Sequence, residues 1–354
     1  MGAPIHRTTD WQSDKYDMII DVRSPAEFAD DHIICAVNMP SLTDNERAQV
    51  GTIYKQQSAF EARKIGGYMA AKNIADHIQA HLVKKPAEFT PLIHCWRGGQ
   101  RSRAFAQICS EIGWVCHVLD GGYKYYRTQI LDHLKYLPSQ YHYIIIAGRT
   151  GSAKTKLLQA LAQKGEQILD LEALANHKGS LLGRMSEEQP SQKLFESRLV
   201  SQLFRFDTNR PVFVESESSR IGDLHIPKLL WHEMILSAVI MVDVQRRQRA
   251  SYLVEEYPHL LSDQTDLNRL IDGMIYRHGH AETQKWRALM AQNDWLALSE
   301  TLLERHYDPA YDQSVTRHER PISGVVSLQK ITQSEISKSA DEIIAISQKA
   351  QKTG

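Results

Sequence analysis

The hydrophobic positions of the chain fall into short apolar runs separated by segments with helical spacing. In the first part, apolar runs at 18–24, 90–96 and 115–122 predict strands. The segment at 102–113, between the last two runs, has helical spacing and ends at Gly113. Strands that alternate with helices are typical of a parallel sheet, so we expect an α/β domain here.

A polar stretch at 132–140, which contains Pro138, separates this part from a second series of apolar runs. Further strands are predicted at 141–148, 167–172, 211–218 and 237–244. A helix is predicted at 155–165, and from about residue 260 onward the pattern is mostly helical. We therefore predict two α/β domains with parallel sheets, at 1–137 and 138–354, the second with a helical C-terminal part.

Composition narrows the class of protein. The 354 residues contain no apolar run of transmembrane length and no signal peptide near the N-terminus, so we expect a cytoplasmic protein without a membrane partner. The four cysteines are too few for a disulfide framework, and none forms a CxxC pair that would indicate structural zinc. A formal net charge of zero argues against indiscriminate nucleic-acid binding but leaves room for a local basic groove.

The stretch IHCWRGGQRSRAF at 93–105 places Cys95 between a predicted strand and a predicted helix. A loop in this position points backbone N–H groups inward and binds anions. The same N–H groups, together with arginines, lower the pKa of a thiol, so we predict a reactive thiolate rather than an inert core cysteine. The residues predicted to hold an anion are Trp96, Arg97, Gly98, Gly99, Gln100 and Arg101.

Two families share this chemistry. His-Cys-x5-Arg is the signature of cysteine-dependent phosphatases, whereas a cysteine in a slightly shorter loop marks rhodanese sulfurtransferases, whose thiolate carries a persulfide. IIDVRSPAEFADDHIICAVNMP at 19–40 resembles the opening signature of rhodanese domains, and VLDGGYKYYR at 118–127 resembles the closing one. Cys35 stands where that family usually has glycine, which we interpret as a turn with negative φ. The longer loop would accept a phosphate-sized anion such as selenophosphate.

A second anion-binding loop is predicted at 148–155. GRTGSAKT follows a strand, opens a helix and matches the phosphate-loop pattern Gly-x4-Gly-Lys-Thr except at Ala153. An alanine is tolerated there in a right-handed conformation and strained in a left-handed one. In this pattern Lys154 reaches the outer phosphate and Thr155 could bind Mg²⁺. The predicted phosphate-binding residues are Gly148, Arg149, Thr150, Gly151, Ser152, Ala153, Lys154 and Thr155.

Two acidic residues follow the apolar run of a later strand. Glu215 ends VFVE, and Glu217 lies two residues on, so the two carboxylates would share one face of an extended chain. They are candidates for a metal ligand, a base or a substrate contact, and the alternative is a pair of solvated acids at a strand end.

The order of the motifs is itself specific. A rhodanese domain followed directly by a phosphate-loop domain resembles one family, the bacterial tRNA 2-selenouridine synthases. Further segments that look like that family lie at 49–66, 170–183, 212–222 and 304–314. The resemblance spans nearly the whole chain and rests on this joint pattern.

The resemblance implies a two-step exchange on 2-thiouridine at wobble position 34 of the Lys, Glu and Gln tRNAs. First, the thiocarbonyl sulfur attacks C1 of geranyl diphosphate and releases diphosphate. Then selenium from selenophosphate, supplied by a selenophosphate synthetase, replaces geranylthiol at C2. In this scheme Cys95 serves the selenation step, and the loop at 148–155 holds the diphosphate of the geranyl donor.

Other basic residues are implied as contacts of phosphate or tRNA, and for the arginines at 246–249 the alternative is a solvated surface. They are His177, Lys178, Arg220, Arg246, Arg247 and Arg249. Two other functions stay open at this point. One is a cysteine-dependent phosphatase with a nucleotide-binding regulatory domain, and the other is a nucleotide-gated adaptor that binds tRNA or relays sulfur.

Overall fold

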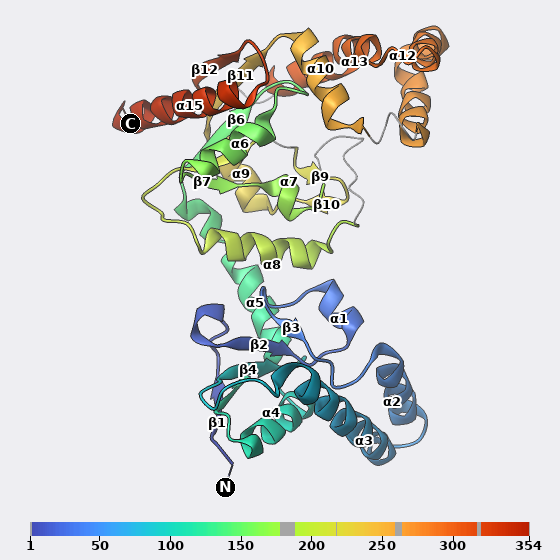
Figure 1. Ribbon diagram of the computed structural model, residues 1–354, viewed down its shortest axis with the longest axis vertical. Helices are drawn as coiled ribbons and strands as arrows, with labels where there is room; N and C mark the ends of the chain where they lie inside the picture. Colours follow the sequence, from blue (N-terminus) through green and yellow to red (C-terminus); the bar gives the residue numbers. More distant parts are fainter. Residues whose placement is uncertain (1, 178–187, 217, 259–263, 317–319, 354) are drawn as a thin grey trace. The chain divides into compact units, whose positions relative to one another are not determined.

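The computed structural model describes residues 2–177, 188–216, 218–258, 264–316 and 320–353 (Figure 1). The chain forms two compact units. Unit 1 comprises Met1–Lys135 and Pro190–Ser201, and unit 2 comprises Tyr136–Gln189 and Gln202–Gly354. The two ranges predicted from the sequence differ from these units chiefly in the segment Pro190–Ser201, which packs with unit 1.

Unit 1 is built on a five-stranded parallel sheet in the order β1-β5-β4-β2-β3. The strands are β1 (Ile5–Thr8), β2 (Met18–Asp21), β3 (Val37–Asn38), β4 (Pro91–His94) and β5 (Cys116–Leu119). The parallel sheet confirms the predicted α/β class. The predicted strands at 18–24, 90–96 and 115–122 correspond to β2, β4 and β5, whereas β1 and β3 were not predicted.

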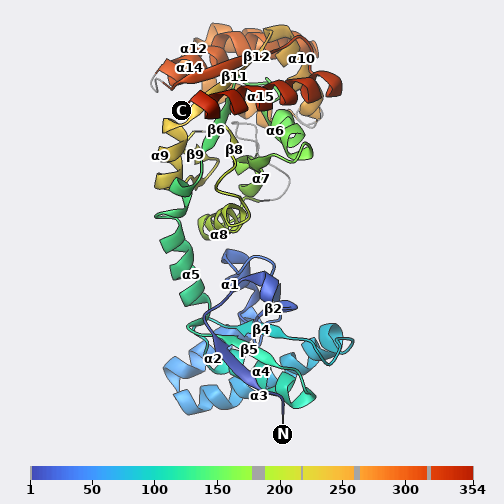
Figure 2. The same ribbon diagram turned by 90° about the vertical axis from the view of Figure 1, so that its left-hand side faces the viewer.

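The helices described in unit 1 are α1 (Pro25–Asp30), α2 (Asp44–Gln56), α3 (Ala59–His77), α4 (Gln100–Ile112), α5 (Gly122–His133) and all but the last two residues of α8 (Gln192–Leu203). A 3₁₀ turn at Ser13–Lys15 and a π-helical turn at Ile78–Leu82 complete the described helical segments of the unit. Helix α4 packs beside β4 and β5 (Figure 2). It buries Phe105, Ala106 and Cys109 in the core and stops at Gly113, as its sequence predicts.

Unit 2 repeats the same architecture, with a parallel sheet in the order β12-β11-β6-β8-β7. Its strands are β6 (Tyr143–Ala147), β7 (Gln167–Leu169), β8 (Val212–Glu215), β11 (Ala238–Val244) and β12 (Ile322–Leu328). A small antiparallel hairpin is formed by β9 (Arg220–Ile221) and β10 (Leu224–His225). Strand β12 lies in the region expected to be mostly helical, and it was not predicted.

The helices of unit 2 are α6 (Lys154–Gln163), α7 (Leu171–Leu174), α9 (Lys228–Leu236), α10 (Arg246–Glu256), α12 (Thr265–Ala291), α13 (Trp295–Leu302), α14 (Asp308–Thr316) and α15 (Gln333–Thr353). A 3₁₀ turn at Leu137–Gln140 precedes β6, and a π-helical turn at Leu303–Tyr307 joins α13 to α14. Within the described ranges, no helix combines the length and apolar composition needed to cross a bilayer.

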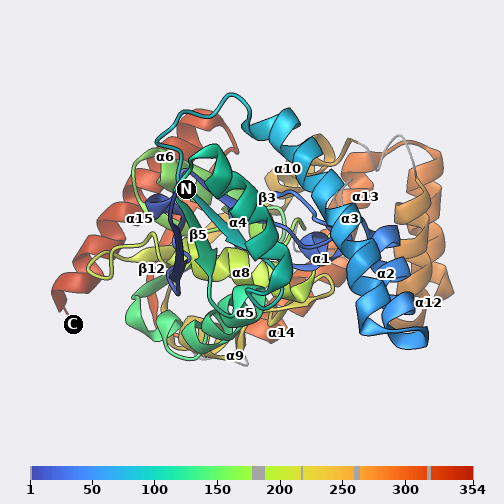
Figure 3. The same ribbon diagram turned by 90° about the horizontal axis from the view of Figure 1, so that it is seen from below.

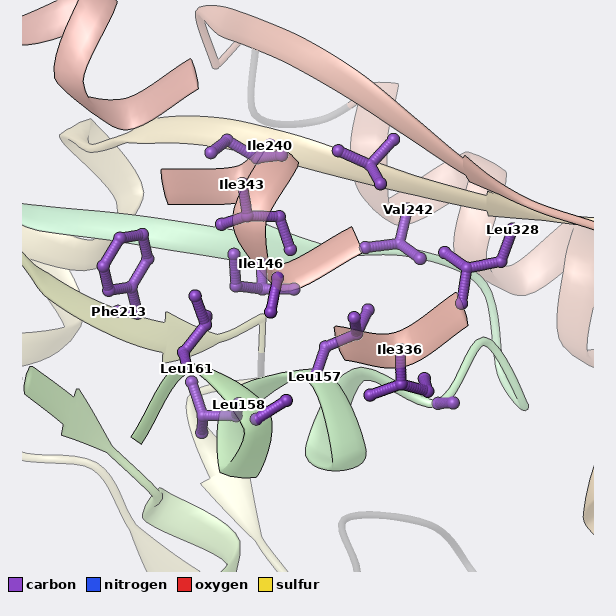
Figure 4. Packing of buried hydrophobic residues seen from close by; sticks show 14 of the residues in the cluster. Ile146, Leu157, Leu158, Leu161, Phe213, Ile240, Val242, Leu328, Ile336 and Ile343 are labelled. Atoms are coloured by element: carbon purple, nitrogen blue, oxygen red, sulfur yellow. The ribbon is translucent and has the colours of Figure 1, made fainter. Parts of the chain in front are cut away.

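Figure 4 shows the core that fixes the start of α6. Leu157, Leu158 and Leu161 point from α6 toward the sheet, where they meet apolar residues of four strands. Ile336 and Ile343 of α15 belong to the same buried cluster. Because α6 is held along its length, the loop at its N-terminus has a defined position at the end of β6.

Candidate functional site

The first candidate site is the loop that joins β4 to α4. Cys95 directly follows β4, and only about 3% of its surface is exposed. The backbone N–H of Gly99 donates a hydrogen bond to the Cys95 sulfur at 3.2 Å, and the Ser102 hydroxyl lies 3.3 Å from the same atom. Ser102 was not among the predicted site residues, although it lies in the first turn of the predicted helix.

Hydrogen bonds set the acidity of the Cys95 thiol. Burial by itself raises its pKa, but the Ser102 side chain and the backbone N–H groups of Ser102, Arg97 and Gly99 outweigh burial and lower the pKa. A thiolate at the N-terminus of a helix is stabilised in this way, and the thiolate is the nucleophilic form of cysteine. The loop can therefore stabilise negative charge at Cys95.

The closing motif at 118–127 packs against the cysteine loop and donates hydrogen bonds to its backbone. The N–H of Tyr123 donates to the Cys95 carbonyl at 2.8 Å, and the N–H of Lys124 donates to the Trp96 carbonyl at 3.0 Å. Gly98 has a φ of 64°, and a Cβ there would lie 2.5 Å from the Leu119 carbonyl oxygen. Gly122 has a φ of 58°, and its missing Cβ leaves room for the Cys95 carbonyl and the Gly98 N–H. The glycines permit a close contact that no side chain would allow.

The opening motif supports the same loop through a buried arginine. Arg23 is 1% exposed, forms an ion pair with Asp21 at 2.5 Å, and donates to the Asp31 carbonyl at 2.6 Å. Its guanidinium carbon lies 3.9 Å from the centroid of the Tyr123 ring, and Tyr123 also contacts Trp96 with ring centroids 5.2 Å apart. The opening and closing rhodanese-like signatures therefore contact each other through Arg23 and Tyr123, next to the loop that carries Cys95.

The remaining residues of the predicted anion loop differ in exposure. Trp96, Arg97 and Gln100 are exposed to solvent at the rim. Arg101 is half-buried, and its guanidinium lies 3.3 Å from Glu27 of α1. Arg97 is thus accessible to an incoming anion, whereas Arg101 is oriented by a carboxylate.

Cys35 corrects one expectation. Its φ is +72°, in the left-handed region, and not negative as expected from the sequence. Cys35 is exposed, so its side chain is not forced into the core. The turn has kept the backbone conformation that glycine favours while carrying a side chain.

The second candidate site is the loop at 148–155, which runs from β6 into α6. Lys154 is the first residue of α6, and its Nζ lies 3.5 Å from Glu215 Oε1. The Thr155 hydroxyl donates to Glu215 Oε2 at 2.9 Å. The structure thus brings Glu215, at the end of β8, to the two loop residues expected to serve a phosphate and a metal. Ala153 precedes them with φ 58° and ψ 31°. It therefore has the left-handed conformation, which is the strained one of the two considered for an alanine at this position.

Two further carboxylates lie near this loop and were not predicted as site residues. Glu172 Oε2 lies 3.5 Å from the Thr155 hydroxyl, and Asp170 accepts the N–H of Ala173 at the start of α7. Burial raises the pKa of Glu215; Lys154 and Thr155 oppose this rise, and Asp170 adds to it. Burial also raises the pKa of Asp170. Within the described part of the chain, no three His, Cys, Asp or Glu residues are arranged to hold a metal ion by themselves.

The other loop residues are held by unit 2. The Ser152 hydroxyl donates to the Arg149 carbonyl at 2.8 Å, and Arg149 forms an ion pair with Asp312 at 3.0 Å. The Arg249 side chain donates to the Thr150 carbonyl at 3.0 Å and pairs with Asp308 at 2.8 Å.

This geometry bears on the basic residues predicted to contact tRNA. Arg249 is 2% exposed and braces the phosphate loop, so its guanidinium is not presented to a ligand at the surface. Arg246 pairs with Glu304 at 3.0 Å and lies 3.4 Å from Asp308, whereas Arg247 is exposed. The Arg249 prediction finds no support in this arrangement, because its charge is already neutralised inside the unit.

The remaining residues predicted to contact phosphate, metal or tRNA lie outside the two loops. Arg220 is exposed in the β9–β10 hairpin and pairs with Asp223 at 2.9 Å. His177 is buried, with 7% of its surface exposed. Glu217 and Lys178 lie outside the described residues.

Comparisons with known proteins match both units. Residues 8–129 match the family described as "Rhodanese-like domain", and residues 141–274 match the family described as "tRNA 2-selenouridine synthase AAA domain".

Curated relatives extend the likeness over most of the chain. A tRNA 2-selenouridine synthase of Shewanella denitrificans is 32% identical over 337 residues, which cover 86% of this chain and 90% of that protein. A second, of Hydrogenovibrio crunogenus, is 30% identical and covers 86% of this chain and 93% of that protein. A third, of Nitrosomonas europaea, is 36% identical over 243 residues, which span 68% of this chain and 63% of that protein.

Proposed function

Because the chain belongs to the family of tRNA 2-selenouridine synthases, we propose that it replaces the sulfur of 2-thiouridine in tRNA with selenium. The substrates would be the Lys, Glu and Gln tRNAs that carry 2-thiouridine at the wobble position. The observation that carries the proposal is the presence of two separate anion-binding loops in one chain of this family. One stabilises the thiolate form of Cys95, and the other places Lys154 and Thr155 at a helix N-terminus.

The phosphate loop would serve the first step. The thiocarbonyl sulfur forms a bond to C1 of geranyl diphosphate, the C1–O bond breaks, and diphosphate leaves with the bonding electrons. Lys154 and the backbone N–H groups at the start of α6 would neutralise the charge that develops on the departing oxygen. Glu215 now lies 3.5 Å from Lys154 and would be displaced from the ammonium group by the diphosphate.

A magnesium ion fits the donors beside this loop. Mg²⁺ prefers oxygen ligands and is often held by one or two protein oxygens together with substrate phosphates. The Thr155 hydroxyl and the Glu215 carboxylate, 2.9 Å apart, would hold it. Bound there, the ion would supply charge neutralisation for the diphosphate.

The cysteine loop would serve the second step. Selenium from selenophosphate bonds to C2, geranylthiolate leaves, and water cleaves the selenium–phosphorus bond to release phosphate. The N–H groups that stabilise the thiolate also suit a phosphate-sized anion, and Arg97 at the rim is accessible to it. Cys95 would carry the selenium or place the donor beside the tRNA, and a selenophosphate synthetase would supply the donor.

Mass spectrometry of tRNA nucleosides tests the two steps separately. With geranyl diphosphate and selenophosphate present, we expect the protein to convert 2-thiouridine to 2-selenouridine. We expect Lys154→Ala to lower geranylation at least about a hundredfold, the size seen when a charge-stabilising group is removed. We expect Cys95→Ala to abolish selenation while leaving geranylation intact.

Matched controls exist for both changes. Lys156→Ala removes another cation of α6, one that pairs with Glu256 of α10, and Cys35→Gly removes an exposed thiol. Both controls should keep both activities. Normal selenation of geranylated tRNA by Cys95→Ala would end the role given to Cys95, and intact geranylation by Lys154→Ala would end that of the phosphate loop. Efficient hydrolysis of an aryl phosphate without any tRNA modification would favour the phosphatase alternative.

A further inference from the structure

Helices α2 and α3 form a hairpin (Figures 1 and 3), and few of its residues are fully buried. Helix α2 has no fully buried residue, and α3 buries only Ala62 and Ile74. Three large aromatic side chains stand in solvent on it: Tyr54 is 63% exposed, Phe60 62% and Tyr68 68%. Exposed aromatic residues that gather on one element are typical of a binding surface.

The hairpin is nevertheless held in place by its sequence. Thr43 and Glu46 form a capping box at the start of α2, and Ser58 caps α3. The Asn73 amide donates to Glu46 at 2.8 Å and ties the two helices together. A Cβ at Gly66 would lie 3.3 Å from the Val50 side chain, so the helices pack closely there. Its exposed side chains are therefore presented on a fixed framework.

The aromatic residues of α3 alternate with lysines. Phe60, Lys64, Tyr68 and Lys72 follow at intervals of four residues, and such residues lie along one face of a helix. All four are exposed. The Lys64 ammonium lies 5.3 Å from the centroid of the Phe60 ring. We call these four residues the α3 stripe.

The stripe lies in a basic segment of a chain that is neutral overall. Residues 47–72 contain five basic residues and a single acidic one, Glu61, whereas the formal net charge of the whole chain is zero. The basic side chains are Arg47, Lys55, Arg63, Lys64 and Lys72. Arg47 pairs with Glu27 at 3.1 Å, and Lys64 pairs with Glu61 at 2.7 Å while its side chain stays about half exposed. The segment therefore carries a net positive charge at the surface, whereas Arg249 is buried in its ion pair with Asp308.

We propose that the α3 stripe, together with the exposed Tyr54 of α2, binds a single-stranded stretch of RNA, with bases stacked on its rings and phosphates on its lysines. The proposal deepens the proposed function, on which it rests, by naming a surface for the RNA substrate. Aromatic rings stack on unpaired bases of any sequence, and interleaved cations follow the backbone. Lysine is depleted from the centres of protein–protein interfaces, so the alternating pattern fits RNA better than a protein partner.

The test measures RNA binding by the full chain, using fluorescence anisotropy over a series of salt concentrations. The probes are an unmodified tRNA(Lys) transcript, its anticodon stem-loop and an RNA duplex of equal length. We expect Phe60→Ala combined with Tyr68→Ala to weaken stem-loop binding about fivefold or more while leaving the salt dependence unchanged. We expect Lys64→Gln combined with Lys72→Gln to reduce the slope of log K against log salt by about one to two units.

Matched controls carry the same changes elsewhere. Tyr276→Ala removes a fully exposed tyrosine of α12, and Lys338→Gln removes an exposed lysine of α15; both should bind RNA as the unmodified chain does. Unchanged affinity of both double variants, in a chain that still makes selenouridine, overturns the proposal and leaves the proposed function standing. If the double variants lose RNA binding and the unmodified chain makes no selenouridine, the RNA-binding surface is supported and the proposed function is wrong.

Two further outcomes decide the kind of partner. Equal weakening of duplex and stem-loop binding by the aromatic variant would overturn the assignment to single-stranded RNA. Sedimentation velocity provides the other check. If the aromatic variant dissociates a dimer of the chain and leaves RNA affinity unchanged, the stripe is a self-association surface and the proposal is wrong.

Discussion

Ala153 has a backbone conformation that is unfavourable for alanine. It immediately precedes α6 and lies in the left-handed region, with φ 58° and ψ 31°, where an L-residue is roughly 1–2 kcal/mol less stable than in the right-handed helix. The sequence raised the question of strain but could not answer it, because contacts distant in sequence set the φ of a loop residue. Gly151 packs against Arg249, and Ser152 bonds to Arg149, so the loop around Ala153 has little freedom to relax.

We therefore expect Ala153→Gly to raise the free energy of unfolding by about 0.5–1 kcal/mol. The gain is smaller than the strain because glycine loses more chain entropy on folding. Ala162→Gly, at an exposed position inside the same helix, is the control and should lower stability by about 0.5–1 kcal/mol. Urea unfolding measures both. A loss of stability in Ala153→Gly would mean that the alanine methyl makes a contact worth more than the strain.

Ser102 was the residue of the cysteine loop that the sequence did not single out. The pattern of strand, Cys95, two glycines and helix was sufficient to predict N–H groups around the sulfur, and the structure has the Gly99 N–H there. It could not indicate a hydroxyl seven residues further on, because that contact depends on how the first turn of α4 faces the loop. The arginines expected to lower the thiol pKa are replaced in this role by Ser102 and the backbone.

The pH dependence of thiolate formation at Cys95 tests whether Ser102 lowers the pKa of the thiol. Because the pKa of folded Cys95 lies below that of an unfolded cysteine, its hydrogen bonds stabilise the fold above the unfolded pKa, and this contribution is lost as pH falls through the folded pKa. We expect Ser102→Ala to move the midpoint of thiolate formation to higher pH. The ultraviolet absorbance of the thiolate, taken as the difference from Cys95→Ala, measures the midpoint.

Ser110→Ala is the matched control for that experiment. Ser110 is also buried on α4, but its hydroxyl bonds to the Ala3 carbonyl. The control should leave the midpoint where it is. If Ser102→Ala also left it unchanged, the backbone N–H groups would be the sufficient cause of the lowered pKa.

At the scale of elements, the strands with continuous apolar runs were predictable. The predicted runs at 141–148 and 237–244 contain β6 and β11, because strands buried on both faces of a parallel sheet need apolar side chains throughout. The edge strands β3 and β12 lack that signal, whereas the edge strand β7 lies in the predicted run at 167–172. Strand β12 carries exposed residues at four of its seven positions, and β3 has only two residues. Their pairing partners, and not their own sequences, make them strands.

Helix α8 is the element whose place the sequence could not indicate. Its pattern is that of any amphipathic helix, yet Arg127 of α5 forms an ion pair with Glu196 and donates to the Lys193 carbonyl at 3.2 Å. Asp30 pairs with Lys193 at 2.6 Å. These contacts join residues more than sixty positions apart, so local spacing carries no information about them.

At the scale of the whole molecule, both units place their chemistry at the same topological position. In each five-stranded parallel sheet the candidate loop follows the central strand, β4 in unit 1 and β6 in unit 2, and leads into a helix. Carboxyl ends of parallel strands and helix N-termini both favour anion binding. This arrangement follows from the strand–loop–helix order, so the positions of the two loops could be predicted from the sequence. The carboxylates near the phosphate loop, Asp170 and Glu172, could not.

The composition of unit 1 leads to a prediction about its independence. Because Pro190–Ser201 belongs to this unit, a fragment of residues 1–137 lacks α8. In this fragment Arg127 has lost its ion-pair partner Glu196. Asp31, with 0% of its surface exposed, also loses its neighbour Ser197. We expect the fragment to be about 1–3 kcal/mol less stable than unit 1 in the full chain, the cost of partly buried polar groups left without partners.

A peptide of residues 190–203 added to that fragment should restore its urea midpoint, followed by tryptophan fluorescence. The same peptide with Glu196→Arg should not, because it places a like charge against Arg127. A fragment that is as stable as the intact unit, and indifferent to either peptide, would contradict the prediction. Residues 1–137 would then fold without α8, and the contacts of α8 would add nothing to stability.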